Sequence, residues 1–141
     1  MYANSVDMQA RFDEQDLVLL TRRATSAPGE IDMTVLNQAL ADATSEINTY
    51  LAGRYQLPLS NVPTSLTRIC CDLARYFLSG NNAPEHIAER YKDATRFLRS
   101  VNKGELALGA DELGNKAAQT DTAIIESAGS VFARNKSTGF I

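Results

Sequence analysis

Apolar residues recur every three or four positions along three long segments of the chain, the spacing of one face of an α-helix. The first segment covers residues 33–53, the second runs from Pro63 to just before Gly80, and the third runs from Pro84 to about Asn102. Short joints separate these segments, which favours antiparallel neighbours. The pattern therefore predicts a mainly α fold built on an antiparallel bundle of three long helices.

Residues that begin and end helices stand at the expected places. Asp32 precedes the first long segment as an N-cap, and a proline opens each of the other two. Gly104 follows the third segment at the position where a left-handed residue often ends a helix. Ahead of the bundle, residues 4–23 contain two short helical patterns, the second starting at Asp13.

The composition changes beyond Gly104. Residues 105–141 contain few large apolar side chains, and glycines interrupt any helical spacing. Two short apolar runs, at 123–125 and 130–132, have the length of short strands, but neither buries itself alone. We expect residues 1–104 to form a helical body and residues 105–141 to form an irregular or partly β C-terminal arm, extended or folded on a neighbour.

The side chains that usually carry catalysis are scarce. The single histidine, His86, stands in the first turn of the third helix, where a solvated position is expected. Cys70 and Cys71 are adjacent, and consecutive helical residues do not offer disulfide geometry, so both are expected to be reduced thiols. No metal-ligand spacing or phosphate-binding loop is present. We expect no enzyme, no metal and no cofactor; a small hydrolase, the alternative, would need His86 or a pair of carboxylates in a pocket.

Charge adds one candidate surface. The net charge of −3 argues against wholesale nucleic-acid binding. One side of the third helix carries acidic residues followed by basic ones, namely Glu85, Glu89, Lys92, Arg96, Arg99 and Lys103. This order suits the helix dipole and allows Glu89 to pair with Lys92. The stripe is either a solvated face that supports the helix or an electropositive ridge that meets an acidic partner or passing DNA.

No stretch approaches the length of apolar sequence that spans a membrane, and the first ten residues do not resemble a signal peptide. The 141 residues fit one domain of ordinary size. A cytoplasmic protein with no membrane contact is therefore expected.

Several motifs resemble those of a family of small proteins from Mu-like phages and prophages. The resemblance covers about residues 1–109. It is carried by Ala39-Leu40-Ala41-Asp42-Ala43, Tyr50-Leu51-Ala52-Gly53-Arg54-Tyr55, Leu57-Pro58-Leu59, Asp72-Leu73-Ala74-Arg75-Tyr76 and Glu89-Arg90-Tyr91-Lys92. Cys70 and Cys71 stand where small apolar residues are expected in this family, which suggests that they pack in the core.

The resemblance implies a gene in the head-morphogenesis region of such phages. The helical pattern also resembles connector proteins that form a ring beneath the portal of tailed phages, an analogy of fold. The expected function is that of a structural head–tail connector (adaptor or head-completion) subunit, found in the host cytoplasm during assembly and at the head–tail junction of the virion. Its expected partners are copies of itself, the portal protein, tail-completion proteins and, non-specifically, passing DNA. The alternative is a small DNA-binding or regulatory helical module of a prophage.

Ten residues are candidates for interaction. Four lie on the third helix and just after it: Lys92, Arg96, Arg99 and Lys103. Three are apolar anchors of the arm: Val131, Phe132 and Phe140. Three lie in the family motifs: Arg54, Tyr55 and Arg75. For these last three, and for Tyr76, we expect a structural role at helix ends or between helices, with direct portal contact as the alternative.

Overall fold

The computed structural model describes residues 1–108. Its elements are α1 (Ser5–Arg11), α2 (Glu14–Thr21), α3 (Met33–Leu51), α4 (Thr64–Ser79), the short 3-10 helix η1 (Gly80–Asn82) and α5 (Glu85–Asn102). No β-strand occurs in this part of the chain. The predicted helical class, the three long helices and the two short N-terminal helices are confirmed. From residue 109 onward, the predicted arm lies outside the described residues.

Helix α3 begins at the capping residue that the sequence predicts, whereas Pro63 and Pro84 each stand one position before their helix rather than at its first residue. Asp32 caps α3, because its Oδ1 accepts hydrogen bonds from the backbone N–H groups of Thr34 at 3.1 Å and Val35 at 3.4 Å. Its other oxygen accepts a hydrogen bond from the Ser26 hydroxyl at 2.6 Å and pairs with Arg23 at 2.8 Å. The hydrogen bonds from Ser26 and Arg23 lower the pKa of Asp32 to about 2. The carboxylate therefore ties the loop before α3 to the start of that helix.

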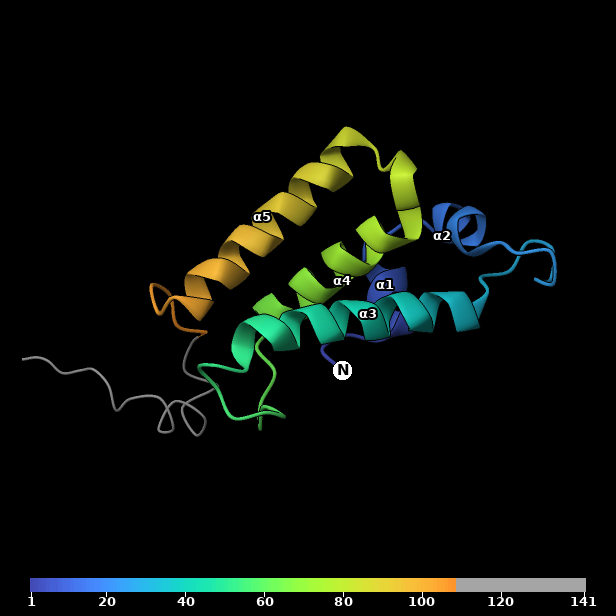
Figure 1. Cartoon of the computed structure of the whole chain (residues 1–141). Coiled ribbons are helices and arrows are strands. Elements are labelled where there is room, and N and C mark those ends of the chain that lie inside the picture. Colours follow the sequence, from blue (N-terminus) through green and yellow to red (C-terminus); the bar gives the residue numbers. More distant parts are fainter. Residues whose placement is uncertain (109–141) are drawn as a thin grey trace, which may run out of the picture.

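Helix α4 occupies the centre of the body. It packs against α3 and α5, and also against the short helices α1 and α2 (Figure 1). All residues from 69 to 75 are buried, so about two turns of this helix have no solvent-facing position. The apolar spacing in the sequence predicted a single buried stripe. The difference arises because α1 and α2 cover a side of α4 that the two long helices leave open.

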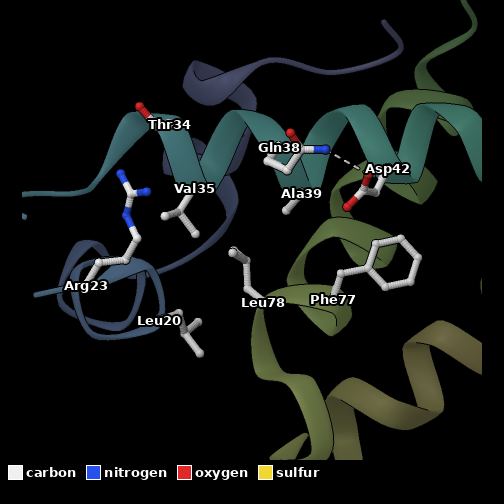
Figure 2. A pocket seen from close by; sticks show the side chains of 9 residues that line it. All are labelled: Leu20, Arg23, Thr34, Val35, Gln38, Ala39, Asp42, Phe77 and Leu78. Atoms are coloured by element: carbon white, nitrogen blue, oxygen red, sulfur yellow. Dashed lines mark hydrogen bonds between the residues drawn. The ribbon is translucent and has the colours of Figure 1, made fainter. Parts of the chain in front are cut away.

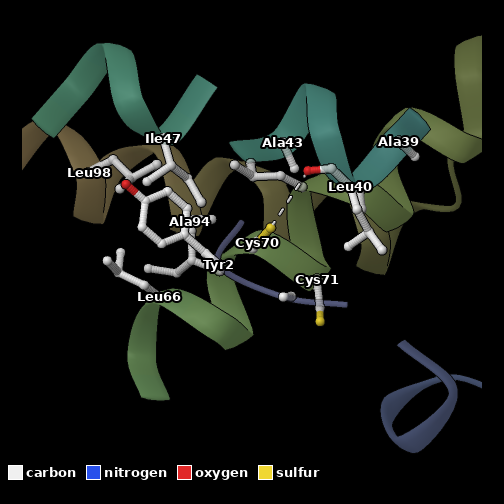
Figure 3. Close-up of a cluster of buried hydrophobic side chains, with 14 of the residues drawn as sticks. Tyr2, Ala39, Leu40, Ala43, Ile47, Leu66, Cys70, Cys71, Ala94 and Leu98 are labelled. Carbon is white, nitrogen blue, oxygen red and sulfur yellow. Dashed lines mark hydrogen bonds between the residues drawn. The ribbon is translucent and has the colours of Figure 1, made fainter. Parts of the chain in front are cut away.

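The core lies where the three long helices meet. Fully buried side chains come from α3 (Leu40 and Ile47), α4 (Leu66) and α5 (Leu98), as Figure 3 shows. Burying one such side chain contributes roughly 1.5–3 kcal/mol relative to leaving it exposed. The predicted apolar stripes of the three helices thus meet in one contiguous core.

The N-terminal residues also belong to this core. Tyr2 is buried, and its hydroxyl donates a hydrogen bond to Asn48 Oδ1 on α3. The Thr67 hydroxyl on α4 donates to the carbonyl oxygen of Tyr2 at 2.9 Å. The first residues therefore connect α3 to α4 before α1 begins. This contact was not among the features predicted from the sequence.

The adjacent cysteines are free, buried thiols, as predicted. Cys70 faces α3, where its sulfur lies 3.8 Å from the hydroxyl of Thr44. Cys71 lies closer to the charged side chains of α1, namely Arg11 and Asp7. Burial raises the pKa of Cys70, and it raises the pKa of Cys71 to about 12. Both thiols therefore stay protonated and unreactive at neutral pH.

Candidate interaction surfaces

The outer side of α5 carries the predicted charged stripe. Lys92 pairs with Glu89 at 3.6 Å, as expected from the sequence, and Arg96 pairs with Asp93 at 2.7 Å. Side chains in both pairs are more than half exposed. Exposed pairs of this kind contribute about 0–1 kcal/mol, so they do little for stability. They do, however, neutralise the middle of the helix surface.

The C-terminal end of the stripe remains cationic. Arg99 and Lys103 are exposed, and neither side chain forms an ion pair within residues 1–108. The helix dipole places partial negative charge at the C-terminal end of α5, and this charge interacts favourably with both cations. Of the four cations predicted on α5 and just after it, these two form no ion pair within residues 1–108 and are available to an anionic partner.

Arg54 closes the same end of α5. Its Nε donates a hydrogen bond to the carbonyl oxygen of Asn102 at 3.1 Å, and its Nη2 donates to that of Lys103 at 2.9 Å. The Asn102 amide in turn donates to the carbonyl oxygen of Tyr50 at 2.8 Å. These bonds satisfy carbonyl groups that a helix end leaves without partners. Arg54 therefore has the helix-capping role that we expected from its motif.

Tyr55 and Arg75 lie inside the body, with 5% and 7% of their surface exposed. The Tyr55 hydroxyl accepts a hydrogen bond from the backbone N–H of Leu108 at 3.3 Å. Arg75 donates a hydrogen bond to the Ser79 hydroxyl, and burial lowers its pKa. Both side chains are largely withdrawn from the surface and form hydrogen bonds within the chain, as a structural role requires.

Tyr76 also has a structural role. Its ring stacks on that of Tyr91, with centroids 4.0 Å apart and planes 13° from parallel. The Tyr91 hydroxyl donates a hydrogen bond to Glu46 of α3 at 3.3 Å. Tyr76 and Tyr91 thus link α4 to α5 and, through Glu46, to α3.

A buried carboxylate joins α1, α4 and α5, and the sequence did not single it out. The side chain of Asp72 is 2% exposed; Arg90 of α5 approaches its Oδ1 to 3.0 Å and Arg68 approaches its Oδ2 to 3.4 Å. Arg11 of α1 is a third nearby cation. The Oδ1 atom accepts no hydrogen bond from the described residues, so Arg90 attracts it without good hydrogen-bond alignment. Burial raises the pKa of Asp72 in spite of the three arginines.

Asp72→Asn is expected to raise the free energy of unfolding at pH 7 by about 1 kcal/mol, because burial of the carboxylate costs more than its imperfect pairs return. A raised folded-state pKa means that the charged form destabilises the fold above that pKa. This cost disappears as the pH falls through the folded-state pKa of Asp72. The difference in the free energy of unfolding between wild type and variant should therefore shrink as the pH approaches the unfolded pKa of about 3.9.

Urea unfolding at pH 7 and pH 4 measures both effects. Asp42→Asn is the matched control, since Asp42 is an exposed carboxylate on α3 and its replacement should change stability by less than about 0.5 kcal/mol. A loss of stability at pH 7 in Asp72→Asn alone would show that the arginine pairs outweigh the cost of burial.

The remaining candidates lie outside the described residues: Val131, Phe132 and Phe140. His86 is exposed in the first turn of α5, as expected. Within residues 1–108, no group of three or more His, Cys, Asp or Glu side chains is placed to hold a metal ion. None of the helices in this part of the chain is both long and apolar enough to cross a membrane.

Comparison with known proteins places the chain in a family. Residues 2–127 match the family model described as "Bacteriophage Mu, Gp36". The chain is 44% identical to the "Mu-like prophage FluMu protein gp36" of Haemophilus influenzae over 111 residues, 79% of each protein. It is 38% identical to "Gene product J" of Escherichia phage Mu over 141 residues, 99% of each. The resemblance seen in the motifs is confirmed: the chain belongs to the bacteriophage Mu Gp36 family.

Proposed function

We propose that this phage protein is a structural, non-enzymatic head–tail connector (adaptor or head-completion) subunit that assembles as a ring at the portal vertex. It would act in the host cytoplasm during assembly and remain at the head–tail junction of the virion. Membership of a phage Mu family supports the viral setting. The ring, the portal contact and the contact with tail-completion proteins are the proposal itself.

One observation carries the proposal, and it concerns the C-terminal end of α5. There two exposed cations without an ion pair within residues 1–108, Arg99 and Lys103, stand in the last turn of α5 and just after it. A ring requires two different complementary faces on each subunit. The cationic end of α5, at one end of the helical body, provides one such face.

A smaller role for DNA rests on the same two cations. Phosphate groups attract exposed arginine and lysine without regard to base sequence, so DNA passing through a ring would meet these side chains favourably. The net charge of −3 opposes a dedicated DNA-binding or regulatory module. We therefore propose non-specific contact within a connector rather than sequence recognition.

The connector proposal predicts a change in sedimentation when portal is present. Analytical ultracentrifugation of the full chain, alone and mixed with the portal protein of the same phage, should show several copies sedimenting with each portal ring. A bystander helical protein of similar mass serves as the control for non-specific association. A chain that remains monomeric and leaves the portal boundary unchanged would contradict the connector assignment.

A further inference from the structure

A groove with an apolar floor opens between α2, α3 and the last turn of α4, with a volume of about 430 Å³. Figure 2 shows Leu20, Val35, Phe77 and Leu78 directed into it from these three helices. Pockets of roughly 300–1,000 Å³ bury ligands of drug size. The groove therefore has room for a short peptide segment carrying one or two large side chains.

The groove has a charged group at each end, Arg23 near the start of α3 and Asp42 two turns along it (Figure 2). Arg23 is already paired with Asp32. Asp42 is exposed and accepts one hydrogen bond, from Gln38 Nε2 at 3.0 Å, and it forms no ion pair within residues 1–108. An apolar segment with a cation near the Asp42 end would pack on the apolar floor of the groove and pair with the Asp42 carboxylate.

The chain beyond residue 108 contains a segment of this kind at 131–134. Val131 and Phe132 are followed closely by Arg134, so apolar and cationic groups stand in the required order. A second apolar run of this region, at 123–125, is flanked by Asp121 and Glu126. Its acidic flanks would meet Asp42 with like charge, which is unfavourable. Charge thus favours residues 131–134 over residues 123–125, and Val131-Phe132 is followed by its cation at the shortest spacing.

The position of the groove favours an occupant from another copy. Leu108, the last residue that the structure describes, binds Tyr55 and therefore lies near the C-terminal end of α3, whereas the groove lies along the N-terminal half of that helix. Donor and acceptor at opposite ends of one subunit are what a head-to-tail contact requires. At about 3.3 Å per residue, the stretch from 108 to 131 reaches up to roughly 75 Å, far more than the roughly 28 Å length of α3.

We propose that residues 131–134 of one copy bind the α2–α3–α4 groove of the next copy. Phe132 packs against Phe77 and Leu78, and Arg134 pairs with Asp42. This proposal rests on the proposed function, because it takes ring assembly as given and specifies the contact that links successive subunits.

Cysteine cross-linking between two full-length variants tests the contact. One variant carries Gln38→Cys at the rim, and the other carries Ala133→Cys, which leaves Phe132 and Arg134 in place. Mild oxidation of the mixture, with portal and without it, should give a covalent dimer that reductant dissolves. The native cysteines interfere little, because both are buried.

Asn37→Cys is the matched control, since Asn37 is an exposed neighbour of Gln38 on α3 that does not line the groove. A disulfide requires Cβ atoms about 4 Å apart, so the Gln38→Cys mixture should give about tenfold more dimer than the Asn37→Cys mixture. Equal yields, or no dimer in either, would overturn the proposal.

A double variant with Gln38→Cys and Ala133→Cys in one chain shows whether the segment in the groove comes from the same chain or from another copy. A closed monomer from this variant, without dimer from the mixture, would assign the groove to the arm of the same chain and overturn our proposal. The connector role is judged separately by sedimentation of the wild-type protein. If the wild type joins the portal but the mixture gives no dimer, the groove assignment alone fails; if the mixture gives dimer but the wild type ignores the portal, the connector role alone fails.

Discussion

Leu98→Ala is expected to lower the free energy of unfolding by about 3 kcal/mol, because it leaves a cavity in a core that cannot fully collapse. Leu98 is fully buried in the cluster where α3, α4 and α5 meet (Figure 3). Domains of this size are stable by roughly 5–15 kcal/mol, so this one change removes a large share of the total. Urea unfolding followed by far-ultraviolet circular dichroism measures the loss.

Leu106→Ala is the matched control for this experiment. Leu106 has the same side chain but is 45% exposed just beyond α5, so its removal should cost less than about 0.5 kcal/mol. Similar losses in the two variants would mean that α5 does not contribute to the core as the structure indicates. The test matters for function because α5 carries both free cations.

Gly104→Ala is expected to cost about 2 kcal/mol, from two separate causes. Gly104 has a φ of 83°, a region in which a side chain costs roughly 1–2 kcal/mol. A Cβ atom here would also lie 2.1 Å from Nη2 of Arg54, so the guanidinium would have to leave the carbonyl groups that it caps. The measurement is again the urea midpoint and slope of each variant.

Two comparisons separate these causes. Gly29 has a similar φ of 76° with nothing within 4 Å of its Cβ position, so Gly29→Ala reports backbone strain alone. In an Arg54→Ala background the clash is absent, so Gly104→Ala should cost only about 1 kcal/mol there. If the costs of Arg54→Ala and Gly104→Ala simply add in the double variant, the guanidinium does not depend on the space that Gly104 provides.

The features predicted correctly from the sequence are those set by neighbouring residues. Helical spacing, the cap at Asp32, the stop at Gly104 and the pairing of Glu89 with Lys92 all depend on residues within one or two turns of each other. Such local preferences act in the isolated chain as well as in the fold. They were sufficient to predict the helical class and the surface of α5.

The features that the sequence did not reveal depend on contacts between distant segments. Arg68 is one helical turn from Asp72, so that pair has a local signal, but nothing in the sequence brings Arg90 or Arg11 to the same carboxylate. The apolar groove is equally hidden, since it forms only where α2 and the end of α4 leave part of α3 uncovered. The Asp72 cluster and the groove both form only when the helices pack together.

The burial of α4 on all sides has a consequence for how this family diverges. In residues 69–75, every position contacts the interior, so no substitution there is free of a packing cost. Neutral changes must accumulate elsewhere, above all on α2 and the outer side of α5. The adjacent cysteines Cys70 and Cys71 fit this constraint, because each is a small side chain packed between helices. A larger side chain at either position would force the helices apart. Within residues 1–108, the rate of sequence drift should therefore be lowest in residues 69–75 and higher at the exposed positions of α2 and α5.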